Sequence, residues 1–128
     1  GIGTYAGRRD EVFAAWKPAI AKLAQYPNVV AKVGGIQMVV NGYGWHERAA
    51  PPSSDELVAA NQDWYDYIIE QFGPQRCMFE SNFPVDKLSC SYTVLWNQFK
   101  KLTKGYSANE RAAMFHDTAK RVYRLPQV

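Results

Sequence analysis

The sequence predicts an α/β fold in which helices alternate with buried parallel strands. Two short apolar-rich runs, residues 29–36 and 76–81, lie between longer segments whose apolar side chains recur with helical spacing. Near-continuous apolar strands are typical of parallel sheets that helices cover on both faces. The composition, 47% hydrophobic and 21% charged, is that of a globular protein, and the length of 128 residues predicts a single domain, residues 1–128.

The first half of the chain predicts one helix, one strand and a long loop. Asp10 can cap a helix over residues 10–25, and Pro18 should kink that helix because it removes a backbone hydrogen bond. The strand that follows carries one charge, Lys32. A loop rich in glycine and aromatic residues then covers residues 34–52. Loops of this length are uncommon in compact domains and are more often functional than idle.

The second half contains two capping boxes, in which a serine and a glutamate three residues later accept hydrogen bonds from each other's backbone. Ser53 and Glu56 form the first box, and Ser107 and Glu110 form the second. The expected elements are a helix at 54–72, a strand at 76–81, a helix at 90–103 and a helix at 107–122. Helices that alternate with buried strands in this way predict a parallel sheet.

Two strands, however, are too few for a stable parallel sheet covered on both faces. A complete (β/α)8 or TIM barrel has eight strand–helix units and about 250 residues. The economical interpretation is that residues 1–128 are the C-terminal βα units of a TIM barrel, incomplete as given. The start at Gly1, inside a glycine-rich turn, favours the same expectation of a piece of a longer protein.

The stretch from Phe72 to Val85 resembles the strand-eight signature of amidohydrolase family 2. That signature reads Phe-Gly-Pro-x-Arg-x-Met-Phe-Gly-Ser-Asp-Trp-Pro-Val. The family is part of the metal-dependent hydrolase superfamily and includes proteins similar to 2-pyrone-4,6-dicarboxylate lactonase and L-fuconolactonase. Residues 115–125 are similar to the closing helix of the family, so the resemblance covers essentially the whole chain. It implies the C-terminal part of a barrel, with the family's His-x-His motif before Gly1.

Asn82 and Glu80 are the candidate catalytic residues at the end of the second strand. Asn82 stands where family members usually carry an aspartate that acts as a metal ligand, a general base or both. An amide cannot ionise or accept a proton from water. Asn82 therefore orients water or substrate, belongs to a site that has lost this step, or only caps the turn. Glu80 shares its face by strand alternation, and we expect a buried ion pair with Lys32 that is either structural or makes Glu80 the proton acceptor.

The long loop after the first strand supplies the candidate substrate-binding residues, which are Tyr43, Trp45, His46 and Arg48. Loops at the carboxyl ends of barrel strands line the active-site mouth. Tyr43 and Trp45 can stack on a flat substrate, and Arg48 can bind a carboxylate. The alternative is a surface loop with incidental aromatic residues.

No metal ligand is predicted among these residues. His46 alone is a poor metal signal, since zinc sites need three or more protein ligands. The family resemblance implies a divalent ion such as zinc, but Asn82 in place of the usual aspartate argues against one here. His116 is expected among the core residues of the last helix. Asp86 and Lys87 directly follow the second strand and either reach the mouth of the site or, as such pairs more often do, form a solvated turn.

The charge pattern disfavours nucleic acid and anionic membranes as partners. The net charge of +3 comes from 15 basic and 12 acidic residues without a block of like charge. No apolar run approaches the ~18 residues of a membrane span. Two cysteines are too few for a disulfide scaffold, which favours a cytoplasmic protein.

The expected function is that of an amidohydrolase-like hydrolase, which opens a lactone or a related cyclic ester or amide of a small-molecule substrate by attack of activated water. The full-length parent would be the enzyme, and the 128-residue piece alone would be inactive. The competing expectation is a non-catalytic half-barrel with a structural or assembly role. Such a piece would self-associate, or would need the missing N-terminal half to cover its strand edges.

Overall fold

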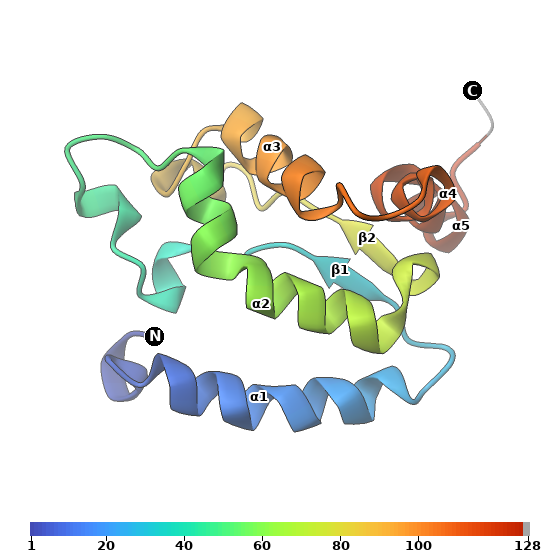
Figure 1. Cartoon of the computed structure of the whole chain (residues 1–128), viewed down its shortest axis with the longest axis horizontal. Coiled ribbons are helices and arrows are strands. Elements are labelled where there is room, and N and C mark those ends of the chain that lie inside the picture. Colours follow the sequence, from blue (N-terminus) through green and yellow to red (C-terminus); the bar gives the residue numbers. More distant parts are fainter. Residues whose placement is uncertain (127–128) are drawn as a thin grey trace.

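The computed structural model describes residues 1–126, which form a helix-rich α/β arrangement around a small parallel sheet (Figure 1). The helices and strands are α1 (Arg9–Ala24), β1 (Ala31–Val33), α2 (Ser54–Phe72), β2 (Cys77–Phe79), α3 (Tyr92–Leu102), α4 (Ala108–Ala112) and α5 (Thr118–Tyr123). α2 packs between α1 and α3 (Figure 1). The predicted alternation of helices and parallel strands is confirmed. Across residues 1–126, every helix is too short or too polar to span a lipid bilayer.

β1 and β2 pair in parallel, with Ala31 opposite Cys77 and Val33 opposite Phe79. The side chains of Val33, Cys77 and Phe79 are buried in a core that is completed by apolar residues of α2 and α3. Both strands are shorter than the predicted runs of 29–36 and 76–81. The backbone turns away after each strand, for example at Gly35, where φ is +79°.

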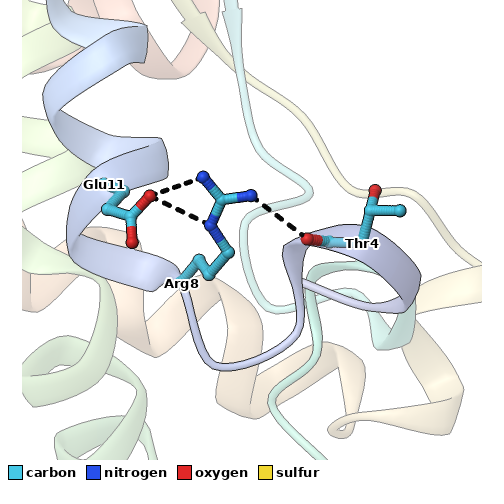
Figure 2. Close-up of polar contacts among 3 residues, drawn as sticks. All are labelled: Thr4, Arg8 and Glu11. Atoms are coloured by element: carbon cyan, nitrogen blue, oxygen red, sulfur yellow. Dashed lines mark hydrogen bonds and ion pairs between the residues drawn. The ribbon is translucent and has the colours of Figure 1, made fainter.

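α1 begins one residue earlier than predicted, and its cap differs. Arg8, not Asp10, occupies the N-cap position. Asp10 lies in the first turn, where its negative charge interacts favourably with the positive end of the helix dipole. Figure 2 shows the arginine donating from Nε and Nη2 to Glu11 Oε2, at 2.9 and 2.6 Å, while Nη1 approaches Thr4 O at 3.5 Å. The helix runs through Pro18 without interruption.

Both predicted capping boxes are confirmed. Ser53 Oγ accepts from the Glu56 backbone at 3.2 Å, and Glu56 accepts from the Ser53 backbone at 2.8 Å. α2 then covers Ser54–Phe72, as predicted. A partly buried arginine follows it: Arg76 donates to the carbonyl oxygens of Phe72 and Ala24, at 3.0 and 2.8 Å. These bonds tie the start of β2 to the ends of α1 and α2.

The predicted last helix at 107–122 is confirmed in extent, but its middle turn is π-helical. A π-helical turn at Ala113–Asp117 separates α4 from α5 and packs against β2. Thr118, which is fully buried, donates from Oγ1 to Gln75 O at 3.1 Å and so anchors α5 beside the start of β2. The expectation that His116 lies in the core is also wrong. Its side chain is 66% exposed and pairs with Asp117, since the wider turn directs it to solvent.

Candidate functional site

A lysine–glutamate pair joins the two strands. Lys32 Nζ and Glu80 Oε2 form an ion pair, and strand alternation explains it, since Lys32 lies opposite Met78, two residues before Glu80. The predicted pair is confirmed, but its predicted burial is wrong. The side chain of Lys32 is 54% exposed and that of Glu80 is 21% exposed, because the sheet within residues 1–126 has no third strand beside Lys32. The hydrogen bond to Glu80, followed by the charge of Glu80, raises the pKa of Lys32.

Two consecutive glycines at the end of β1 make room for the candidate catalytic side chains. A Cβ on Gly34 would lie 2.5 Å from Glu80 O and 2.6 Å from Glu80 Cγ. A Cβ on Gly35 would lie 3.0 Å from Asn82 Nδ2 and 3.2 Å from Met38 Sδ. Glu80 and Asn82 therefore approach the backbone of the neighbouring strand closely. The structure places both predicted catalytic residues at the carboxyl-terminal end of the parallel strands.

A buried polar network lies directly behind Asn82. Asp86 is fully buried and accepts from the Asn82 backbone N–H and from Gln37 Nε2, both at 2.8 Å. The hydroxyl of Tyr65 donates to Gln37 Oε1 at 3.0 Å, and Ser89 Oγ donates to Gln37 O at 2.8 Å. Burial raises the pKa of Tyr65 far above its ordinary value, so it acts as a neutral donor. The expectation of a solvated turn is wrong for Asp86, because the turn folds its side chain inward onto these donors.

The side-chain nitrogen of Asn82 has no protein partner. Asn82 Nδ2 is buried and makes no hydrogen bond within the part of the chain that the structure describes. Buried donors are nearly always paired, so each exception requires an explanation. This donor lies just after β2, against the backbone of Gly35, and protein atoms enclose it. An oxygen atom of a ligand or of water reaches it only when the Asn82 side chain turns away from Gly35.

Tyr43 and Trp45 stack on each other, with ring centroids 5.6 Å apart and an angle of 12° between the planes. The guanidinium of Arg9, from α1, lies 4.3 Å from the centre of the Tyr43 ring and donates to its hydroxyl. Arg9 also donates to Ala60 O at 2.7 Å. Burial raises the pKa of Tyr43, which keeps the phenol neutral. Tyr43 lines a hollow of about 220 Å³ together with Trp64.

The other three predicted loop residues gather around a larger hollow of about 450 Å³. Arg48 lies 5.3 Å from the Trp45 ring centre and forms an ion pair with Glu56 at 2.8 Å. Burial, followed by the charge of Asp86, raises the pKa of the Cys90 thiol to about 11, so that it is neutral. The lining is aromatic and basic, and consists of Trp45, His46, Arg48, Pro51, Phe83, Lys87, Leu88, Ser89, Cys90, Ser91 and Tyr92.

The predicted site residues therefore form two groups. Glu80 and Asn82 lie at the strand ends, and the loop residues lie around the hollows. Phe83 lines the larger hollow and directly follows Asn82, so the loop after β2 connects the groups. Sequence reasoning missed Arg9 and, in the buried network, Gln37, Tyr65 and Ser89, because no periodicity marks a contact between distant elements. The glycine doublet after β1 was a usable signal, since paired glycines often mark close backbone approach.

The described residues do not supply a set of ligands that fits a metal ion. Within residues 1–126, no group of three His, Cys, Asp or Glu side chains lies close enough together to hold one. Asn82 offers only a neutral amide oxygen, and His46 lies beside Glu47 alone, at 3.7 Å. Protein metal sites need several converging ligands, and the described residues do not supply such a group.

A protein-family model described as Amidohydrolase matches residues 2–125. Among curated proteins, the chain is similar to y4mH of Sinorhizobium fredii, an uncharacterized protein, with 43% identity over 113 residues, or 88% of this chain and 34% of that protein. It is also 35% identical over 121 residues to the L-fucono-1,5-lactonase of Burkholderia multivorans, or 94% of this chain and 38% of the lactonase.

Two crystal structures of an amidohydrolase from Burkholderia multivorans are similar to the chain, both at 32% identity. The structure with bound HEPES has a TM-score of 0.80 and matches 95% of this chain and 40% of its own. The structure with bound zinc has a TM-score of 0.77 and matches 91% and 39%. The chain thus spans between 34% and 40% of the length of these relatives.

Proposed function

Since this chain belongs to the amidohydrolase family, we propose that it supplies the C-terminal βα units, and part of the active site, of a (β/α)8 hydrolase. The reaction is the opening of a lactone, or of a related cyclic ester or amide, by water. The relative named as an L-fucono-1,5-lactonase supports a small cyclic ester as the substrate class. The paired strands, with helices between them and polar residues at their carboxyl ends, support the barrel.

The observation that carries this proposal is the placement of Glu80 and Asn82 over the glycines at the end of β1. Glu80 accepts a proton from water while the water oxygen attacks the carbonyl carbon of the lactone. Lys32 forms an ion pair with Glu80 and so orients its carboxylate. Asn82 Nδ2 turns from the Gly35 backbone and donates to the carbonyl oxygen as negative charge develops there. The ring C–O bond then breaks, and the proton passes to the leaving oxygen, which gives a hydroxy acid.

The loop residues bind the substrate beside this centre. Trp45 and Tyr43 provide apolar surface, and His46 and Arg48 provide donors for the polar groups of the substrate. Arg48 already pairs with Glu56 at 2.8 Å, so it enters the site as an oriented donor and not as a free charge. This arrangement favours a substrate with a compact ring and several oxygen atoms.

The 128-residue chain alone is expected to be inactive. The Lys32 side chain is 54% exposed, so water screens its interaction with Glu80. A sheet of two strands also leaves one edge of each strand unpaired. Both features call for further strands, which the remaining part of a barrel supplies.

The substitution Glu80→Gln tests the proposal, and it is made in the full-length protein that contains the complete barrel. Hydrolysis of a panel of sugar lactones, including L-fucono-1,5-lactone, is followed by acid release. Removal of a general base is expected to lower kcat by about 10²- to 10⁴-fold. Glu47→Gln is the matched control, since Glu47 is an exposed loop carboxylate with a side chain 76% exposed. Near-normal turnover by the Glu80→Gln variant would refute the catalytic assignment.

The second candidate function is a structural half-barrel that pairs its strand edges with another copy of the chain. The unpaired edges of β1 and β2 are the observation that favours it. Size-exclusion chromatography with light scattering tests this alternative. Strictly monomeric behaviour, together with lactone turnover, would leave only the hydrolase.

A further inference from the structure

We propose that Asp86 is a positioning residue that holds Asn82 at the strand end, an inference whose catalytic consequence rests on the proposed function. Asp86 is fully buried, and its carboxylate forms no ion pair with any lysine, arginine or histidine of residues 1–126. Aspartate is almost never fully buried without a charged partner, because burial of a carboxylate is costly unless hydrogen bonds satisfy it. The hydrogen bonds that it accepts therefore define its role.

Two of the bonds at Asp86 fix the backbone of Asn82. Asp86 Oδ2 accepts from the Asn82 backbone N–H at 2.8 Å, and the Asp86 backbone N–H donates to Asn82 O at 3.0 Å. The backbone N–H and the backbone carbonyl of Asn82 are thus both hydrogen-bonded to Asp86. Because both bonds converge on one buried residue, the direction in which the Asn82 side chain leaves the strand end is determined.

The second carboxylate oxygen ties this turn to two other elements. Asp86 Oδ1 accepts from Gln37 Nε2 at 2.8 Å, and Gln37 Oε1 accepts from the Tyr65 hydroxyl at 3.0 Å. Gln37 lies in the loop after β1 and Tyr65 lies in α2, and both are fully buried. Asn82 therefore cannot shift against β1 or α2 without breaking hydrogen bonds to a buried charge, which are stronger than neutral ones.

Hydrogen bonding, and not the charge itself, is the property that the position requires. Alanine at position 86 would leave the Asn82 N–H and Gln37 Nε2 without acceptors in a dry environment. Asparagine retains one oxygen for the Asn82 N–H. If the Gln37 side-chain amide turns over, its oxygen accepts from the new amide and its nitrogen donates to the Tyr65 hydroxyl, since a hydroxyl can also accept.

The test compares three variants of the full-length protein: Asp86→Ala, Asp86→Asn and a control, Thr103→Val. Thr103 is fully buried, but its hydroxyl donates to Phe99 O of α3 at 2.8 Å, away from the network. The first measurement is amide hydrogen exchange at Asn82, with Leu95 of α3 as the internal reference. The second is kcat and KM for lactone opening. If Asp86→Ala does not fold, Asp86→Ser replaces it, since serine is too short to reach both donors.

Asp86→Ala is expected to accelerate exchange at Asn82 by about 10- to 100-fold, as for the loss of a bond to a charged group, and to leave Leu95 unchanged. It should lower kcat by about 100-fold, the effect of a misplacement of about 1 Å, with KM within about 3-fold. Asp86→Asn should restore most of both values, and Thr103→Val should change neither.

Unchanged exchange at Asn82 in Asp86→Ala, or a fall in kcat equal to that of Thr103→Val at the same loss of stability, would overturn the proposal. Failure of the wild-type protein to open any lactone would refute the proposed function only. The exchange at Asn82 would still decide whether Asp86 positions it.

Discussion

Replacing Gly34 by alanine should destabilise the sheet at its carboxyl end, where Glu80, just after β2, packs against Gly34, just after β1. The added Cβ would lie 2.5 Å from Glu80 O and 2.6 Å from Glu80 Cγ, both closer than the 3.0 Å at which a neighbour must shift. The nearest atom belongs to the backbone, so relief requires β1 and the end of β2 to separate. Gly34 does not have a positive φ, and the cost is therefore steric. Overpacking of this kind costs about 1–3 kcal/mol.

Urea unfolding followed by circular dichroism measures the effect. A loss of about 2 kcal/mol corresponds to a midpoint about 1 M lower for an m value of about 2 kcal/mol per M. Gly105→Ala is the matched control, because a Cβ added at Gly105 would have no atom within 4 Å and the φ of Gly105 is not positive. That substitution should be neutral or stabilising by about 0.4–1 kcal/mol. Equal stability of the two variants within about 0.5 kcal/mol would refute the close approach of Glu80 to Gly34.

Two further predictions concern the polar contacts. In Lys32→Met, stability should depend less on alkaline pH than in the wild type. Glu80 raises the pKa of Lys32 above its ordinary value of 10.5. The pair therefore contributes fully to the free energy of unfolding below pH 10.5, and this contribution is lost as the pH rises through the pKa of Lys32 in the folded protein. Urea midpoints at about pH 9 and about pH 12 measure this, and equal falls in both proteins would contradict it. Tyr65→Phe should lower the free energy of unfolding by about 1–2 kcal/mol, because buried Gln37 Oε1 loses its donor. A urea-unfolding change below about 0.5 kcal/mol would contradict the importance of that bond.

Local signals in the sequence accounted for much of the fold. The capping box at Ser53 and the glycine at position 73 delimit α2, whose predicted and observed bounds agree. Strand alternation predicted Lys32 as the partner of Glu80, and the structure confirms that pair. The prediction of Asp10 as the N-cap is wrong because the helix already begins at Arg9, which leaves Arg8 at the N-cap without a capping side-chain hydrogen bond.

The sequence by itself determined the alternating α/β order, the parallel pairing of two strands and the Lys32–Glu80 pair, because each depends on periodicity or on neighbours along the chain. Only the tertiary structure decided that Asp86 is buried and that Gln37 reaches it, since these residues are 49 positions apart. Contacts at such a distance depend on how the loops after β1 and β2 fold back on α2. No local pattern encodes that geometry, so the residues that hold Asn82 in place became visible only in the folded chain.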